Sequence, residues 1–208
     1  MNKNNPWNNI QLSDYENHMQ SDNVQQLQTL NRIMKEQIDR YPICSLSILG
    51  IAGGNGLEHV NSYKIKQVYG IDINNSYLEV CKGRYPYLSD VFIGMCIDLS
   101  NPKESLPESE LVIANLFIEY VGLDIFTSKL KEAHPNYVSC VIQENRENQF
   151  VSNSPYEDSL NTLANIHIVI NKEELISSMK KIKYIPTLIE EYHLPNGKLF
   201  HRIDFELK

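Results

Sequence analysis

A glycine-rich segment constrains the fold of this chain more than any other feature. It reads Gly50-Ile51-Ala52-Gly53-Gly54-Asn55-Gly56, lies at the end of the apolar run of residues 45–51, and precedes an expected helix over residues 56–63. Glycines allow the backbone to approach a ligand closely, and a helix that begins there directs its unbonded N–H groups at the same ligand. The segment predicts a small-ligand site at the carboxyl end of the first strand, with a plain tight turn as the alternative.

Short apolar runs and helix-like stretches alternate through the rest of the chain. The runs at residues 45–51, 67–71, 91–93, 111–114 and 137–142 are solidly apolar, as in strands covered on both faces. Helices expected at residues 76–85 and 123–133 lie between them, which predicts a parallel sheet between two helical layers. A helix over 172–179 and two runs at 185–192 and 199–207, joined by Asn196-Gly197, predict a closing antiparallel hairpin. We expect an α/β, Rossmann-like, doubly wound, mostly parallel seven-stranded sheet.

The first 44 residues differ from this pattern and are expected to form an N-terminal arm and helical lid, apart from a domain over residues 45–208. Residues 1–11 are polar, Asn-rich and expected to be loose. A short helix from Ser13 carries Tyr15 and His18, and a longer helix is expected over residues 22–40 because apolar side chains recur every three or four positions.

Charge and composition restrict the partners. The net charge of −7 disfavours general binding to nucleic acid, since the phosphate backbone repels an acidic protein. No apolar run approaches the roughly 20 residues that span a bilayer, and no signal peptide is recognised at the start. The four cysteines form no C-x-x-C pair, which favours buried free thiols over a metal site. We expect a cytoplasmic protein without metal or membrane.

Two aspartates that follow strands narrow the choice of ligand. The glycine segment lacks the Gly-Lys-Ser/Thr of a Walker loop and fails the dinucleotide pattern at both ends. Asp72 ends the second strand, where a carboxylate can accept hydrogen bonds from both ribose hydroxyls, or can cap the next turn. Asp98 follows the third strand, where it can meet an adenine amino group beside the Leu99 N–H, or can also cap a turn.

Together these residues resemble the class I S-adenosylmethionine-dependent methyltransferases from about Leu46 to the C-terminus. Residues 48–56 match the family's glycine motif, although Gly50 stands in place of the usual acid and Ala52 in place of the first glycine. The resemblance implies S-adenosylmethionine as the cofactor. It also implies a set of cofactor-binding residues, namely Gly50, Ala52, Gly53, Gly54, Asn55, Gly56, Asp72, Ile73, Asp98, Leu99 and Asn115.

The methyl acceptor is harder to infer, because transfer from an activated sulfonium needs positioning more than a fixed nucleophile. Asn115-Leu116-Phe117-Ile118 lacks the prolines of the family's Asn/Asp-Pro-Pro-aromatic motif, which disfavours methylation of adenine or glutamine nitrogen. Glu119 is a candidate general base or ligand for a cationic acceptor, with a solvated helix-start acid as the alternative.

Two further segments are candidates for the choice of acceptor. His18 and Tyr15 in the expected lid are candidate catalytic residues, with a surface or packing pair as the alternative. The polar stretch 143–165, which includes Arg146, suggests a substrate loop.

The leading hypothesis is methyl transfer to a small-molecule acceptor. The alternatives are a cofactor-binding regulatory or assembly protein without transferase activity, a protein or RNA methyltransferase, and a nicotinamide oxidoreductase. A homodimer is left open.

Overall fold

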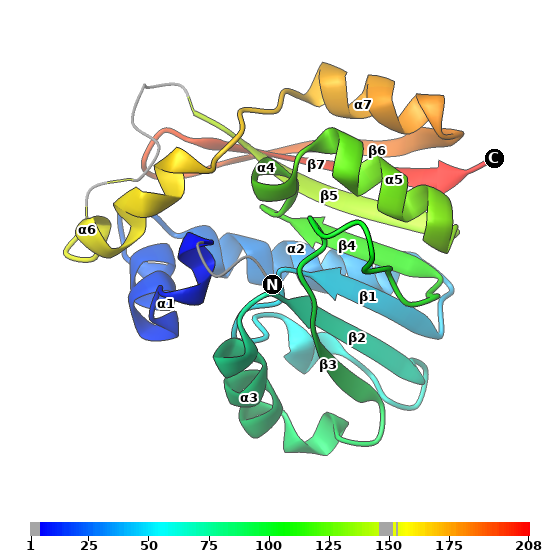
Figure 1. The fold of residues 1–208 in the computed structure, drawn as a ribbon, viewed down its shortest axis with the longest axis horizontal. Helices are drawn as coiled ribbons and strands as arrows, with labels where there is room; N and C mark the ends of the chain where they lie inside the picture. The colour runs from blue at the N-terminus through cyan, green and yellow to red at the C-terminus, as the bar shows by residue number, and fades with distance from the viewer. Residues whose placement is uncertain (1–4, 146–151, 153) are drawn as a thin grey trace.

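The computed structural model describes residues 5–145, 152 and 154–208, and these residues form one seven-stranded sheet between helical layers (Figure 1). The strand order is β3-β2-β1-β4-β5-β7-β6. The strands are β1 Ser45–Leu49, β2 Gln67–Asp72, β3 Phe92–Cys96, β4 Leu111–Asn115, β5 Tyr137–Glu144, β6 Tyr184–His193 and β7 Leu199–Leu207. Neighbours from β3 to β5 pair in parallel, and β7 is antiparallel to both β5 and β6. The predicted fold class is confirmed, closing hairpin included.

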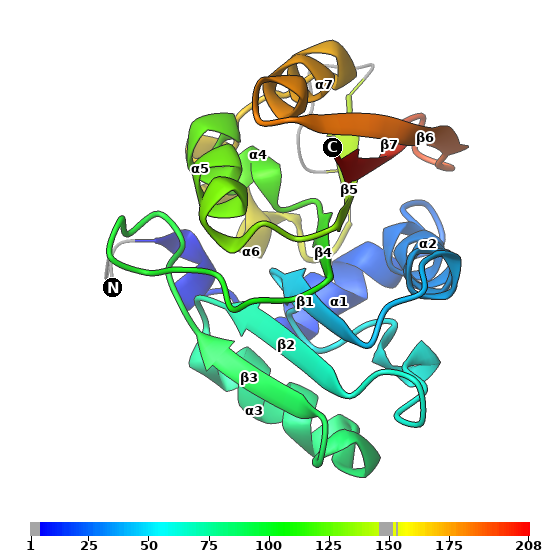
Figure 2. The same ribbon diagram turned by 90° about the vertical axis from the view of Figure 1, so that its right-hand side faces the viewer.

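Helices cover both faces of this sheet (Figure 2). The α-helices are α1 Leu12–Gln20, α2 Gln26–Arg40, α3 Asn75–Arg84, α4 Ile118–Val121, α5 Leu123–Ala133, α6 Glu157–Leu160 and α7 Lys172–Lys181. Short 3-10 turns are η1 Pro6–Asn8, η2 Leu57–His59, η3 Pro86–Leu88 and η4 Asn161–Asn165. Across residues 5–145, 152 and 154–208, no helix combines the length and the apolar content needed to cross a membrane.

The central strands are apolar on both sides because each face meets its own helical layer. In β4, Leu111 and Ile113 pack in a core with α2 and α3, whereas Val112 and Ala114 pack in a core with α5 and α7. Successive side chains of a strand point to opposite faces, so one continuous apolar run supplies both cores. This packing fixes the carboxyl ends of β1 and β4 side by side.

The helix expected over residues 56–63 is wrong. The chain makes only the single turn η2, after Gly54 and Gly56 adopt φ values of +87° and +95°. The side chain of Met34 on α2 packs so closely on Gly56 that a Cβ there would lie 2.5 Å from it. Helix α2 covers the part of the sheet where a helix after Gly56 would pack, so a second helix is not needed there to bury the core.

The loose arm expected over residues 1–11 is also wrong from residue 5 onward. Pro6 occupies the first turn of η1, and Ile10 is buried. The Trp7 ring meets Tyr15 edge to face at a centroid distance of 5.4 Å, and Tyr120 at 5.1 Å. Two apolar side chains in a polar segment are enough to fix it, because they pack with Tyr15 of α1, Tyr120 of α4 and two leucines of α6 and η4.

Of the four cysteines, all free thiols, Cys81 and Cys140 are buried as expected, whereas Cys44 is exposed and Cys96 half-buried. The expectation of burial is wrong for Cys44 because it precedes β1 at the open amino end of the sheet, where its backbone N–H donates to Glu110.

Candidate functional site

The larger of two adjoining cavities opens at the carboxyl ends of β1, β2 and β4. It holds about 1130 Å³, its mouth included. From β1 the chain runs outward through β2 to β3 on one side, and it then returns to place β4 on the other side of β1. Such a switch point is where open α/β sheets bind ligands. Among its lining residues are Trp7, Tyr15, Gly50, Ala52, Asp72, Ile73, Tyr77, Asp98, Leu99, Asn115, Leu116, Phe117 and Tyr120.

The first residues of the glycine segment form part of this lining. Gly50 has φ +65°, and a Cβ there would lie 3.0 Å from the Phe117 ring, so the backbone can sit this close only without a side chain. Ala52 also has a positive φ, +48°, and its N–H donates to Asp72 at 2.9 Å. The loop is therefore tied to the end of β2.

Asp72 and Asp98 face the same cavity, and each is only 8% exposed. Asp72 Oδ1 accepts from the Asn74 N–H and Oδ2 from the Ala52 N–H, both at 2.9 Å. Burial raises the pKa of Asp72, while these backbone N–H groups oppose the shift. Asp98 Oδ1 accepts from the Ser100 N–H at 3.0 Å, so Asp98 caps a turn and borders the cavity at once. Each carboxylate has lone pairs left for a ligand hydroxyl or amino group.

The later residues of the glycine segment point elsewhere. Gly53 lies under the ion pair of Arg84 with Glu16, and Gly54 packs against the Cys81 thiol. Asn55 donates to the Leu27 backbone oxygen at 2.9 Å. Thus Gly50 and Ala52 lie at the cavity, whereas Gly53, Gly54, Asn55 and Gly56 hold the loop against α1, α2 and α3.

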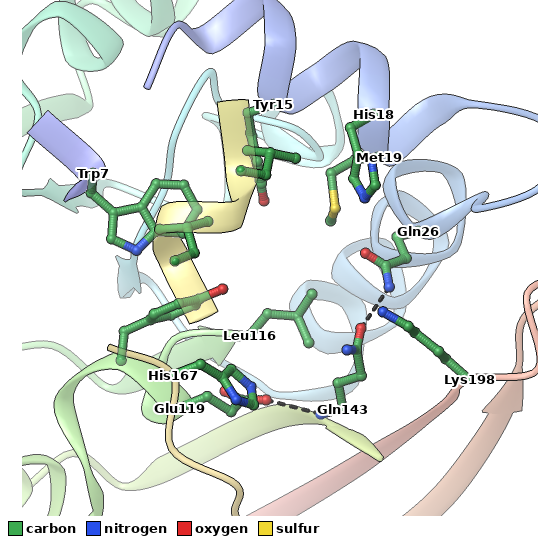
Figure 3. Close-up of a pocket in the computed structure, with 13 residues that line it drawn as sticks. Trp7, Tyr15, His18, Met19, Gln26, Leu116, Glu119, Gln143, His167 and Lys198 are labelled. Atoms are coloured by element: carbon green, nitrogen blue, oxygen red, sulfur yellow. Dashed lines mark hydrogen bonds between the residues drawn. The ribbon is translucent and has the colours of Figure 1, made fainter. Parts of the chain in front are cut away.

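A smaller cavity of about 570 Å³ adjoins the larger one, and Trp7, Tyr15, Leu116 and Tyr120 border both. Figure 3 shows side chains from the N-terminal helices, α4, the end of β5 and the hairpin converging on it. Its remaining lining residues are His18, Met19, Gln26, Glu119, Gln143, Leu160, Leu163, His167 and Lys198.

Glu119 is the most strongly perturbed acid of the smaller cavity. It is 1% exposed, and its Oε1 accepts from the Gln143 N–H at 2.9 Å. Burial raises its pKa from 4.5 to about 7, against the effect of that hydrogen bond. The alternative of a solvated helix-start acid is therefore wrong: α4 turns this side chain inward, where Ile118 is also buried.

The two candidate catalytic residues of α1, Tyr15 and His18, also border this space. His18 Nδ1 is 2.7 Å from the Ser154 hydroxyl, and burial, with the charge of Lys198, lowers its pKa to about 4. Tyr15 separates the two cavities, and burial together with Asp72 raises the pKa of its hydroxyl far above the ordinary value. Near neutral pH His18 is thus uncharged and Tyr15 keeps its proton.

The sequence did not indicate several residues that the structure brings to the site, namely Trp7, Leu116, His167 and Lys198. Leu116 has φ +53°, a strained value for a leucine, at the border of both cavities. The one available signal was Trp7, a lone large aromatic residue in a polar segment. Arg146, the candidate for an anionic substrate, lies outside the residues that the structure describes. Among the described residues, no three or more His, Cys, Asp or Glu side chains are arranged to hold a metal ion.

Comparison with known proteins rests on structure alone. No protein-family model matches the sequence, and no curated protein matches it either. A geranyl diphosphate methyltransferase solved with S-adenosylmethionine is similar over 86% of this chain and 85% of its own, at 11% identity and a TM-score of 0.64. The magnesium protoporphyrin IX methyltransferase ChlM of Synechocystis PCC 6803, with bound S-adenosylhomocysteine, is similar over 94% and 86%, at 8% identity and 0.61.

A protein with a different activity has the same architecture. The [4+2]-cyclase SpnF is similar over 88% of this chain and 82% of its own, at 9% identity and a TM-score of 0.66. The chain therefore has the fold of the class I S-adenosylmethionine-dependent methyltransferases, and the resemblance read from the sequence is confirmed at the level of the fold.

Proposed function

We propose that this protein binds S-adenosylmethionine in the larger cavity and transfers its methyl group to a small molecule in the smaller one. The observation that carries the proposal is the pair of buried carboxylates, Asp72 and Asp98, facing one cavity at the switch point of the sheet. Neighbours of the same fold were solved with this cofactor or its demethylated product. Bound there, S-adenosylmethionine supplies a methyl group on a positively charged sulfur.

The lining residues match the parts of this cofactor in order. Asp72, with Ile73 beside it, has lone pairs for the ribose hydroxyls, and Asp98 with the Leu99 N–H suits the adenine edge. Gly50, Ala52 and Asn115 border the remaining end. Residues 53–56 act by shaping the loop, because they pack against helices. Residues 1–44 then serve as the lid of a domain formed by residues 45–208.

Three residues around the acceptor orient it and remove its proton. Glu119 is the general base, since a pKa near 7 suits proton removal at neutral pH. Tyr15 donates a hydrogen bond at the border of the cavities, and uncharged His18 helps to hold the acceptor. A small acceptor is favoured because residues of the proposed lid (Trp7, Tyr15, His18, Met19 and Gln26) line the smaller cavity, and the acidic chain disfavours RNA.

Isothermal titration with S-adenosylhomocysteine tests the cofactor. We expect saturable binding of one molecule per chain, with NAD as a control ligand that does not bind. Absence of binding at millimolar S-adenosylmethionine and S-adenosylhomocysteine contradicts the proposal, and preferential binding of NAD favours an oxidoreductase.

A second candidate is a protein that binds the cofactor without transferring its methyl group. The likeness to a [4+2]-cyclase motivates it, since the same fold there carries a reaction other than methylation. Tight binding of S-adenosylmethionine, with no S-adenosylhomocysteine formed across a panel of hydroxyl, amine, thiol and carbon acceptors, favours this candidate.

A further inference from the structure

One carboxylate oxygen in the smaller cavity lacks a partner within the described part of the chain. Glu119 Oε2 is buried and makes no hydrogen bond there, whereas Oε1 of the same carboxyl group accepts from Gln143. A buried oxygen without a partner costs about 1–3 kcal/mol, and more when it is charged. Because Glu119 lines a cavity, a bound molecule can satisfy this oxygen.

The walls around Glu119 are mainly aromatic and aliphatic. Trp7 stands edge to face with both Tyr15 and Tyr120, and Tyr120 meets the His167 ring at 5.9 Å. The aliphatic side chains of Met19, Leu116, Leu160 and Leu163 complete this lining. Such walls suit a flat, largely apolar molecule.

Among the titratable groups that line or adjoin this space, Glu119 is the one that can carry a negative charge near neutral pH. Burial lowers the pKa of His18 and His167 to about 4, so both are uncharged, and it lowers the pKa of Lys198 to about 8. Burial raises the pKa of Tyr15, Tyr120 and Cys140 on β5, so all three keep their protons.

These features select the chemistry of the atom that meets Glu119. An N–H or O–H group completes the hydrogen bonding of Oε2, and a cationic amine also compensates its charge and is favoured by aromatic faces. A carboxylate there would place two negative charges in direct contact. An apolar carbon would leave Oε2 without a partner.

We propose that the acceptor is a flat, mainly apolar molecule whose nucleophile is an amine or hydroxyl bonded to Glu119 Oε2, and not a carboxylate. The inference rests on the proposed function. The lone pair of the acceptor nitrogen or oxygen forms the new bond to the methyl carbon, and the pair of the broken carbon–sulfur bond stays on sulfur. The acceptor's proton passes to Glu119 Oε2 and then to water.

Binding of simple probes tests this assignment without turnover. Benzylamine, phenol and benzoate are titrated by NMR into the protein saturated with S-adenosylhomocysteine. We expect benzylamine, a cation at both pH values, to bind about tenfold more tightly at about pH 7.5 than at about pH 5.5, because only ionised Glu119 compensates its charge. Phenol should bind at both pH values, because the neutral carboxyl group can also hydrogen-bond its hydroxyl. Both pH values lie below the pKa of Lys198, so Lys198 keeps most of its charge at both.

Glu119→Gln supplies the matched variant, and Glu132→Gln, at an exposed position of α5, is its control. We expect Glu119→Gln to abolish the pH dependence of benzylamine binding and to weaken that binding about tenfold at about pH 7.5. Benzoate should bind to the variant at least as tightly as to the wild type. Wild-type binding of benzylamine that does not tighten with pH overturns the assignment, as does benzoate binding at about pH 7.5 that needs Glu119. Failure to bind S-adenosylhomocysteine instead overturns the proposed function.

Discussion

The side-chain amides of Gln37 and Asn115 bind each other through two reciprocal hydrogen bonds, each 2.9 Å long. Gln37 is fully buried on α2 and donates also to the Ser139 hydroxyl at 2.8 Å. Ser139 in turn donates to buried Asp204, which pairs with Arg202. A polar chain thus runs from β7 to the Asn115 amide at the border of the larger cavity, and it fixes which way that amide points.

Replacing Gln37 tests this connection. Gln37→Leu leaves Asn115 and Ser139 without this partner, so we expect a loss of about 1–3 kcal/mol in unfolding free energy and about tenfold in affinity for S-adenosylhomocysteine. Thermal unfolding and calorimetry measure the two effects. Gln28→Leu, at an exposed position of the same helix, is the control. An unchanged affinity in a destabilised variant would show that Asn115 does not depend on Gln37.

Asp72 is expected to carry the ribose end of the ligand. Asp72→Asn removes a charged acceptor, and hydrogen bonds to charged groups contribute about 1.5–3 kcal/mol, so the dissociation constant for S-adenosylhomocysteine rises at least about tenfold. Asp90→Asn, at an exposed position, leaves it unchanged. Equal affinities for the two variants in calorimetry would remove the ribose assignment.

Alanine substitutions at two glycines, Gly54 and Gly197, distinguish the cost of backbone strain from the cost of steric contact. Gly54 and Gly197 both have positive φ, +87° and +77°, but a Cβ would meet close neighbours only at Gly54, where it would lie 2.7 Å from Cys81 Sγ. Gly197→Ala should cost about 1–2 kcal/mol through strain alone. Gly54→Ala should cost at least about 1 kcal/mol more, because the core must also shift. Denaturant unfolding of both variants measures the difference, and equal losses would contradict it.

The buried acid makes stability depend on pH. The pKa of Glu119 rises from 4.5 in the unfolded chain to about 7 in the folded one, so the folded state holds the extra proton between these values. Stability from this group is therefore present below pH 4.5 and is lost as pH rises to about 7, by roughly 3 kcal/mol. Glu119→Gln should remove this loss. The unfolding free energies of wild type and variant are measured from about pH 4.5 to 7. The same pH dependence in both proteins would refute this prediction.

The only tryptophan, Trp7, borders both cavities and gives an optical signal for ligand entry. We expect its fluorescence emission to shift when S-adenosylhomocysteine binds, because the ligand replaces water near the ring. The midpoint should equal the calorimetric dissociation constant, and Trp7→Phe should lose the signal. A constant spectrum at saturating ligand would mean that the ligand lies away from Trp7.

The elements that the sequence predicted well are those whose pattern is local. Helix α5 has the expected bounds, because its apolar positions recur within a few residues. The strands were found for a similar reason, since solid apolar runs between helices leave few alternatives to a doubly covered sheet. Asn196-Gly197 located the closing hairpin through its own turn chemistry. Asp72 and Asp98 border the larger cavity, as expected, because they lie at the carboxyl ends of β2 and β3.

The residues that the sequence misplaced depend on partners far along the chain. Nothing near Gly56 indicates that Met34 packs on it and that no helix follows. Nothing near Glu119 indicates that the fold brings Gln143 to its carboxylate and that burial raises its pKa. Trp7 is fixed by Tyr120, more than a hundred positions away.

The sequence by itself determined the layers of this protein, the order of its elements and the edge of the sheet at which a ligand site lies. The tertiary structure alone decided which glycines border the larger cavity, which acid is buried, and which amide holds Asn115. The physical reason is range: propensity and turn chemistry act over a few residues, whereas burial and hydrogen bonding depend on groups that only the folded chain brings together.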